Sequence, residues 1–271
     1  MTQGFKGRFD LLTIYGVGFL IFLYGPVLLI PLFSFNDSLF AIFPLKGFTL
    51  KAYYQLSGDL RLIQSVKNSV MVGIGVSVLS TAFGLLGAMA VTRYRLPGRG
   101  PVVGTIMLPL VVPSIILGVA ILVILRKVLD IDLSLWTVGA GHVMLCVPFS
   151  MLVLISRLEG FDRGLEEAAM DLGESGWMTF WRVTFPLALP GIISSLLMSF
   201  TTSFDEYVLA FFLSGMDQTL PIFLWSQLRF PQKLPPTLAL GASILFVSTV
   251  VVVVSELLRR RGVQTQKPSG L

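Results

Sequence analysis

Six long apolar stretches are the feature of this 271-residue sequence that most constrains its fold. A bilayer core about 30 Å thick needs about 20 apolar residues per helical crossing. We predict transmembrane helices over about residues 11–33, 66–92, 102–125, 135–155, 187–213 and 238–258. Each stretch is continuously apolar, whereas the strands of a membrane barrel alternate over about ten residues. The sequence therefore predicts an all-α integral membrane protein, with six transmembrane helices in a single domain over residues 1–271.

Composition supports the membrane assignment. Hydrophobic residues make up 54% of the chain and charged residues 13%, against roughly 25% charged residues in soluble domains. The first apolar stretch is too long for the core of a signal peptide, so we interpret it as a retained helix. We interpret the net charge of +5 as a determinant of orientation rather than as a sign of nucleic-acid binding.

Basic residues outside the apolar stretches predict the orientation. Short loops rich in Lys and Arg stay in the cytoplasm, and the connection after the second stretch carries Arg93, Arg95 and Arg99. The basic residues near the two ends of the chain fall on the same side in this scheme: Lys6, Arg8, Arg259, Arg260, Arg261 and Lys267. Arg126 and Lys127 argue against it. We expect a multi-pass protein with both termini in the cytoplasm.

The cytoplasmic connection over about residues 157–186 is acidic and amphipathic. One helical face of it is apolar and contains Phe161, Leu165, Ala168, Ala169 and Leu172. Gly173 stands where a helix would end in a left-handed residue, and Ser175 is placed to cap a second helix. A helix lying on anionic lipid is one interpretation, but such helices carry Lys and Arg on their polar face. A protein partner with a basic groove fits better.

The residues of this loop resemble those of a known family. Glu167, Ala168 and Ala169 are followed by Gly173, and Phe180, Val183, Pro186 and Pro190 come after it. This order resembles the EAA loop of permease subunits in binding-protein-dependent ABC importers. The resemblance covers nearly the whole chain and is nearest to the polyamine branch, which imports spermidine and putrescine. It includes the strings SFNDS, GFTLKAYYQL, RYRLPGR, SRLEGFD and SFDEYV.

The resemblance implies a type I importer permease in the bacterial inner membrane. Its partners would be a second homologous permease, two ATPase subunits that hold ATP and Mg, and a soluble periplasmic binding protein. The ATPase-docking residues would be Glu166, Glu167, Ala168, Ala169, Asp171 and Gly173. GFTLKAYYQL, in the outer connection over about residues 36–64, would form a short periplasmic element where the binding protein lands.

The sequence itself offers no site for catalysis. It contains no G-x-x-x-x-G-K-[ST] loop for nucleotide phosphates, and no H-E-x-x-H, C-x-x-C or G-x-S-x-G motif. We therefore expect a non-catalytic subunit that binds no cofactor or metal, with energy supplied by other subunits. The single histidine, His142, is expected to be a packed or pore-adjacent residue. A secondary carrier driven by an ion gradient is the alternative from another class.

Polar residues in the fifth apolar stretch are candidates for the substrate pathway. Ser195, Ser199, Thr202 and Glu206 fall on one helical face, which would point to a water-filled path or to a partner helix. Asp205 and Glu206 would pair with a cationic substrate, and Tyr207 and Trp225 would add cation–π surface. The alternative for the two acids is a structural pair or a helix cap. Opines, other amines and related small solutes stay open as cargo.

Small residues and prolines in the other stretches predict packing and bends. Ser80, Gly84 and Ala88 recur every four residues, a pattern that lets membrane helices approach closely. Pro109 and Pro113 lie in the third stretch and are expected to bend it.

Overall fold

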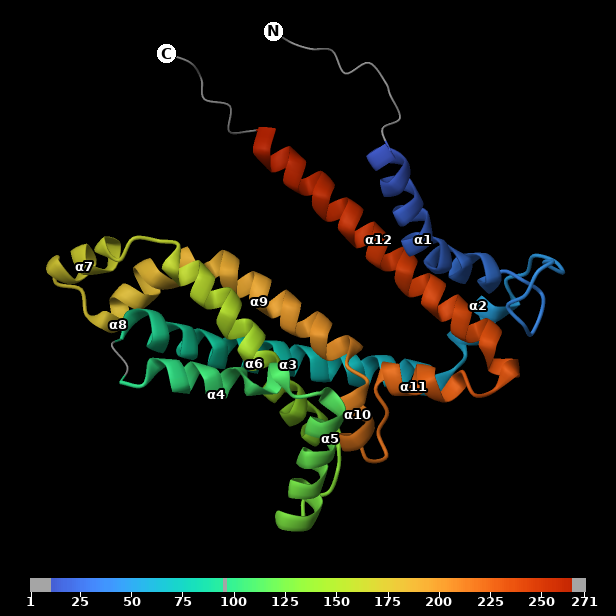
Figure 1. Cartoon of the computed structure of the whole chain (residues 1–271), viewed down its shortest axis with the longest axis horizontal. Coiled ribbons are helices and arrows are strands. Elements are labelled where there is room, and N and C mark those ends of the chain that lie inside the picture. The colour runs from blue at the N-terminus through green and yellow to red at the C-terminus, as the bar shows by residue number, and fades with distance from the viewer. Residues whose placement is uncertain (1–10, 95–96, 265–271) are drawn as a thin grey trace, which may run out of the picture. The chain divides into compact units, whose positions relative to one another are not determined.

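The computed structural model describes residues 11–94 and 97–264 (Figure 1). Lys6, Arg8, Arg95 and Lys267, which contributed to the predicted orientation, lie outside the described residues, as do the side chains of residues 251–264. The chain divides into two compact units, one formed by Met1–Asp59 with Ser226–Leu271 and the other by Leu60–Trp225. Within the described residues the β-structure is limited to an isolated bridge between Asn36 and Phe48.

Helices long and apolar enough to cross a membrane dominate both units. Five such segments are Leu12–Ser34, Leu60–Arg93, Leu135–Glu159, Gly176–Asp205 and Pro231–Val250. A bent pair, Arg99–Val111 with Ser114–Val128, whose halves meet at 101°, makes a sixth crossing when its two halves count as one span. The predicted all-α membrane fold is confirmed, and these segments agree with six spans.

The first unit contains two long helices that lie side by side, α1 (Leu11–Ser34) and α12 (Leu234–Gln264) (Figure 1). The connection that follows α1 contains a short helix, α2 (Lys51–Ser57), which also packs against α12. A 3₁₀ turn, η3 (Pro231–Lys233), precedes α12. The Ser34 hydroxyl lies 2.7 Å from the Tyr53 hydroxyl and joins α1 to α2.

The core of the second unit is a bundle of α3 (Leu60–Arg93), α6 (Leu135–Glu159) and α9 (Phe185–Asp205), each packed against the other two (Figure 1). The predicted small-residue face of α3 lies in this bundle, since Ser80 and Ala88 are fully buried. A Cβ added to Gly84 would lie 2.6 Å from the Ser150 Cβ. A larger residue there would force α3 and α6 apart, so glycine is what permits their close approach.

A proline breaks the predicted third span. α4 (Arg99–Val111) ends before Val112, whose extended backbone (φ −76°, ψ 128°) is the conformation that a following proline favours. Pro113 then begins α5 (Ser114–Val123), which continues into a π-helical turn, η1 (Ile124–Val128). The expected bend is therefore a complete break at Pro113, whereas Pro109 lies inside α4 without ending it.

The predicted fifth span is also interrupted. α9 ends at Asp205, Glu206 has an extended backbone (φ −72°, ψ 111°), and a separate short helix, α10 (Val208–Leu213), follows. A further helix, α11 (Leu220–Gln227), comes before the start of η3. The expectation of one continuous helix over residues 187–213 is wrong, and the two acidic residues lie at the break rather than inside a helix.

Candidate functional site

The acidic loop between α6 and α9 folds as a helix, a sharp turn and a second helix. Its elements are α7 (Gly164–Asp171), α8 (Gly176–Thr179) and a π-helical turn, η2 (Phe180–Thr184). Gly173 has φ +93°, which confirms the predicted left-handed residue. Glu174 N donates to Ala169 O at 3.1 Å and Gly173 N to Met170 O at 2.9 Å, the pattern of a Schellman motif. Ser175 accepts from Met178 N at 3.3 Å and caps α8, as predicted.

Glu166 is the residue by which α7 is attached to the rest of the second unit. Its side chain is 12% exposed and forms an ion pair with Arg93, the last residue of α3, with 2.7 Å between Glu166 Oε2 and Arg93 Nε. The Thr184 hydroxyl at the end of η2 donates to Glu166 Oε1 at 2.7 Å. Both carboxylate oxygens therefore have partners inside the chain, one at the end of α3 and the other at the end of η2.

Further contacts fix the arginine itself. Arg93 Nη2 donates to Leu158 O at 3.2 Å, near the end of α6, and the guanidinium carbon lies 4.7 Å from the centre of the Phe161 ring. Arg163, directly before α7, donates to Thr92 O. These contacts join Arg93 to the end of α6, and the residue before α7 to the end of α3. These contacts thus fix the loop to the end of the helical bundle.

These contacts bury an acidic side chain of α7 and leave apolar side chains exposed. Leu165, Met170 and Leu172 are 50%, 47% and 87% exposed, whereas Glu166 is buried. The predicted apolar stripe is split, because Phe161 turns to Arg93 while Leu165 and Leu172 turn outward. The carboxylate of Glu166, expected at a docking surface, is engaged within the chain. The exposed side chains, here called the α7 outer face, are Leu165, Glu167, Ala168, Met170, Asp171 and Leu172.

The predicted polar stripe of α9 is a set of contacts between helices. Ser195 and Ser199 are buried, and their hydroxyls lie 2.9 Å from that of Thr81 in α3 and 2.8 Å from that of Ser150 in α6. Of the two directions left open by the sequence, these residues face partner helices. Thr202 is partly buried beside them.

His142 belongs to the same buried network. Its Nδ1 lies 2.8 Å from the Ser203 hydroxyl, and the imidazole is 1% exposed. It is therefore a packed residue, one of the two roles expected for it. Sequence reasoning overlooked Ser203, although Ser195, Ser199 and Ser203 follow one another at four-residue spacing, which is a helical face.

The break at the end of α9 gives its two acids different environments. Glu206 Oε1 accepts from Val208 N at 2.9 Å and from Leu209 N at 3.1 Å, so this carboxylate caps α10. Asp205, the last residue of α9, is exposed. The Tyr207 and Trp225 rings are stacked with centres 5.4 Å apart. The structure thus groups four of the predicted substrate-pathway residues in two pairs. Asp205 and Glu206 lie at the break of α9, and Tyr207 and Trp225 form a ring stack.

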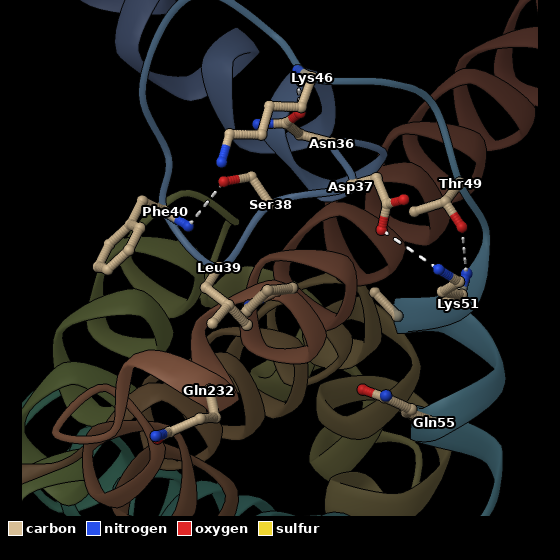
Figure 2. A pocket seen from close by; sticks show the side chains of 12 residues that line it. Asn36, Asp37, Ser38, Leu39, Phe40, Lys46, Thr49, Lys51, Gln55 and Gln232 are labelled. Carbon is tan, nitrogen blue, oxygen red and sulfur yellow. Dashed lines mark hydrogen bonds and ion pairs between the residues drawn. The ribbon is translucent and has the colours of Figure 1, made fainter.

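The first unit has a polar cavity of about 380 Å³ beside α2, formed by the connection that follows α1 and by the start of α12 (Figure 2). Lys46 N donates to Asn36 Oδ1 at 3.0 Å, and Lys51 Nζ lies 3.5 Å from Asp37 Oδ1. Figure 2 shows Asn36 and Lys46 toward one end of the cavity and Gln55 and Gln232 toward the other. The string GFTLKAYYQL supplies α2 and one wall of this cavity, which the sequence did not reveal.

Comparison with known proteins identifies the family. The family model described as "Binding-protein-dependent transport system inner membrane component" matches residues 80–263. The chain is 33% identical to the spermidine/putrescine transport system permease protein PotC of Escherichia coli K12, over 88% of this chain and 90% of that protein. It is 32% identical to the putrescine transport system permease protein PotI of the same strain, over 77% of this chain and 76% of that protein.

A solved structure supports the fold. The structure of a bacterial alginate ABC transporter in complex with an alginate pentasaccharide-bound periplasmic protein matches 93% of this chain and 93% of the compared chain, with a TM-score of 0.68 and 17% sequence identity. The extent of the family match and the identity to the curated relatives favour an importer subunit over an ion-gradient carrier. The chain belongs to the family of inner-membrane components of binding-protein-dependent transport systems, and is a multi-pass permease subunit.

Proposed function

We propose that this chain forms half of the translocation pathway of an ATP-driven importer for a small cationic solute such as spermidine or putrescine. The cargo is inferred from the names of the relatives, which are spermidine/putrescine and putrescine permeases. The observation that carries the coupling part of the proposal is the α7 outer face. It presents exposed apolar side chains on a helix that a buried ion pair fixes to the bundle.

The α7 outer face would dock into an ATPase subunit. Large apolar side chains such as Leu172, 87% exposed, are typical of an interaction site when they lie together. Glu167 and Asp171 beside them favour a partner with a basic rim around an apolar cleft. We therefore assign docking to the α7 outer face, add Ala169 and Gly173 on the resemblance to the EAA loop, and assign Glu166 to the anchor that fixes α7 to the bundle.

The assembly would contain a second homologous permease and two ATPase subunits that bind ATP and Mg. Closure of the ATPases on ATP would draw the two coupling loops together and switch the pathway from inward-facing to outward-facing, and hydrolysis would reset it. The anchor of Glu166 to Arg93 and Thr184 would transmit the movement of α7 to α3 and α9. This scheme places α7 and both termini in the cytoplasm.

The polar cavity beside α2 would contribute to the face that receives a periplasmic binding protein. The connection that forms it joins α1 to α3, and lies on the opposite side of the membrane from α7 in the proposed orientation. Its lining combines Lys46, Lys51 and Asp37 with uncharged polar groups, which suits hydrogen bonds to a protein partner. The solved alginate transporter complex includes a periplasmic protein, which supports a partner of this class.

The outer end of α9 is the proposed place where the cargo meets charge. Asp205 is exposed there and Glu206 is close in sequence, with only Oε1 engaged in the cap of α10. The stacked Tyr207 and Trp225 rings offer a π surface to a protonated amine. Ser199 faces α6 and would contribute to the pathway only by holding the helix that carries the acids.

Reconstitution of the whole importer tests this proposal. The permease pair, the ATPases and the binding protein would be assembled in liposomes, and ATP hydrolysis and uptake would be measured with and without spermidine. We expect the loaded binding protein to stimulate ATP hydrolysis and Glu167→Lys to abolish that stimulation, because a basic partner rim would repel the new charge. Glu159→Lys is the matched control, since Glu159 is exposed but lies outside α7.

Two results would contradict the proposal. Spermidine uptake that follows an ion gradient without ATP would exclude the importer. Full coupling in Glu167→Lys would exclude docking through the α7 outer face. Parallel assays with an opine and with other amines would show whether the cargo belongs to a different class of small solute.

A further inference from the structure

A basic cavity of about 550 Å³ lies at the end of α3, beside the start of α4 and the residue before α7. Its lining residues are Val91, Thr92, Arg93, Tyr94, Pro97, Arg99 and Arg163. Three of them carry a guanidinium group and none carries a carboxylate. We infer that this cavity binds the phosphate group of an anionic phospholipid.

The three arginines keep donors available for such a ligand. The described contacts of Arg93 use Nε and Nη2, and those of Arg163 and Arg99 use one Nη2 each. A guanidinium has five N–H donors in a planar fork that matches phosphate oxygens. Among the described residues, Nη1 of each arginine has no protein acceptor, so each guanidinium keeps an N–H donor group that can bind a shared anion.

The nearby carboxylates leave an excess of positive charge. Glu166 pairs with Arg93 in a nearly buried contact, and this pair neutralises one charge. Glu159 lies 3.4 Å from Arg99, but both side chains are more than half exposed, so this pair is weak. Arg163 donates to the Thr92 carbonyl. The ion pair with Glu166 thus fixes Arg93, whereas the positive charge of Arg163 has no carboxylate partner among the described residues. This excess of positive charge favours a ligand with one or two negative charges.

The surroundings of the cavity favour a lipid over a free phosphate. The cavity lies at the end of a membrane-spanning helix, and Tyr94 in its wall is 66% exposed, as is common at a membrane interface. A second, largely apolar hollow of about 320 Å³ begins just along α4, lined by Pro101, Val102, Thr105 and Ile106. A phosphate held by the arginines and an acyl chain laid along α4 would fill both features.

The inference rests on the proposed function, which places this end of α3 in the cytoplasmic leaflet, where anionic lipids contact basic residues.

The test is lipid binding by the complete transporter. The transporter would be purified in detergent and titrated with phosphatidylglycerol or phosphatidylcholine, and the bound lipid would be counted by native mass spectrometry. Each basic residue near an anionic surface contributes about fivefold in affinity. We expect the wild-type transporter to bind phosphatidylglycerol more tightly than phosphatidylcholine. Arg99→Gln should lower the affinity for phosphatidylglycerol about fivefold, and the double variant Arg99→Gln with Arg163→Gln should lower it about 25-fold.

Matched variants make the result decisive. Arg182→Gln removes an exposed arginine of the same loop that does not line the cavity, and should leave lipid affinity unchanged. Arg163→Lys keeps the charge and should restore most of the affinity lost in Arg163→Gln. Equal affinity for the two lipids, or wild-type affinity in the double variant, would overturn the inference. Displacement of the lipid by an equal concentration of inorganic phosphate would overturn the lipid assignment and leave an anion site.

Lipid counting requires neither ATP nor cargo, so its outcome is separate from that of the coupling assay. Loss of coupling in Glu167→Lys with normal lipid binding would support both proposals. Normal coupling in Glu167→Lys with normal lipid binding would contradict only the docking role.

Discussion

The loop that precedes α9 and the break that follows it both depend on a glutamate, but the two glutamates act over different distances. Glu166, in the loop, joins Arg93 at the end of α3 to Thr184 at the start of α9, so it connects segments far apart in the sequence. Glu206 accepts hydrogen bonds from Val208 and Leu209, its own near neighbours. The first holds a tertiary arrangement and the second starts a helix. Substitution of Glu166 should therefore cost more stability than substitution of Glu206. The first should disturb the packing of distant segments, and the second should affect the start of one helix.

Removing the Glu166 carboxylate should produce the largest loss of stability. The Glu166 and Arg93 side chains are 12% and 10% exposed, and loss of one partner leaves the other charge buried. Breaking a buried pair in this way costs about 3–5 kcal/mol. We expect Glu166→Ala to lower the free energy of unfolding of the second unit by about that amount, measured by thermal unfolding of the purified assembly.

The control for this prediction is another glutamate and arginine pair near the same end of the bundle. Glu159 and Arg99 are 55% and 53% exposed, and exposed pairs contribute about 0–1 kcal/mol. Glu159→Ala should therefore change the unfolding temperature little. Equal losses in the two variants would show that Glu166 does not anchor α7.

Gly173 should give the next largest effect. Its φ of +93° is the left-handed region, where a residue with a Cβ costs about 1–2 kcal/mol. Among the described residues, no atom outside Gly173 and its two chain neighbours lies within 4 Å of the position that an alanine Cβ would take, so Gly173→Ala tests the backbone and not a clash. We expect this cost in stability together with weaker coupling of ATP hydrolysis to uptake, because α7 would end at a different angle.

Gly98 is the matched control for Gly173. It also has positive φ, +72°, and open space around its Cβ position, but it precedes α4. Gly98→Ala should lose similar stability and retain coupling, whereas Gly173→Asn should recover both, since Asn tolerates this conformation. Equal coupling in Gly98→Ala and Gly173→Ala would remove the turn from the coupling mechanism.

The features that could be predicted from the sequence are the local ones. Gly173 and Ser175 have their predicted roles because a helix end and a helix cap depend on residues within a few positions. The membrane-spanning helices were predictable because apolar length reports directly on the bilayer. The cap by Glu206 was one of two roles left open, and its two hydrogen bonds are equally local.

The features that could not be predicted depend on pairing between distant segments. Arg93 was interpreted only as a determinant of orientation, because nothing in its neighbourhood indicates that it meets Glu166. An apolar stripe is normally the buried face of a helix, yet the ion pair turns Leu165 and Leu172 outward on α7. The break at Glu206 was missed, and the bend expected at Pro113 was not recognised as a break, because apolar length does not distinguish one helix from two joined ones.

Glu206 should give a smaller effect than either loop residue, and two substitutions separate its roles. Glu206→Ala removes the cap of α10, and losing a helix cap costs about 1 kcal/mol. Glu206→Gln keeps an oxygen that accepts these bonds but removes the charge. If the carboxylate also attracts a polyamine, Glu206→Gln should retain stability and raise the KM of uptake about fivefold, since a charge pair 4 Å apart in water contributes about 1 kcal/mol.

The uptake assay with spermidine distinguishes the two roles directly. Asp205→Asn removes the neighbouring exposed charge without touching the cap. Unchanged KM in both Glu206→Gln and Asp205→Asn would restrict Glu206 to capping, and would remove the outer break from the proposed substrate pathway.

The middle of α9, between the two glutamates, should give the smallest effect. Ser199 and Ser150 have hydroxyls 2.8 Å apart in a buried contact between α9 and α6. Hydrogen bonds between membrane helices average only about 0.6 kcal/mol, because the helices find other partners when separated in the membrane. A double-mutant cycle of Ser199→Ala and Ser150→Ala should therefore give a coupling energy near this value. Thr201→Ala, which removes an exposed hydroxyl bonded within α9, should show no coupling to Ser150.

Since Ser199 faces a helix and not the cargo, its alanine variant should leave the KM of uptake unchanged. A raised KM would show that the path passes between α6 and α9, and the polar residues that join these helices would then separate during transport.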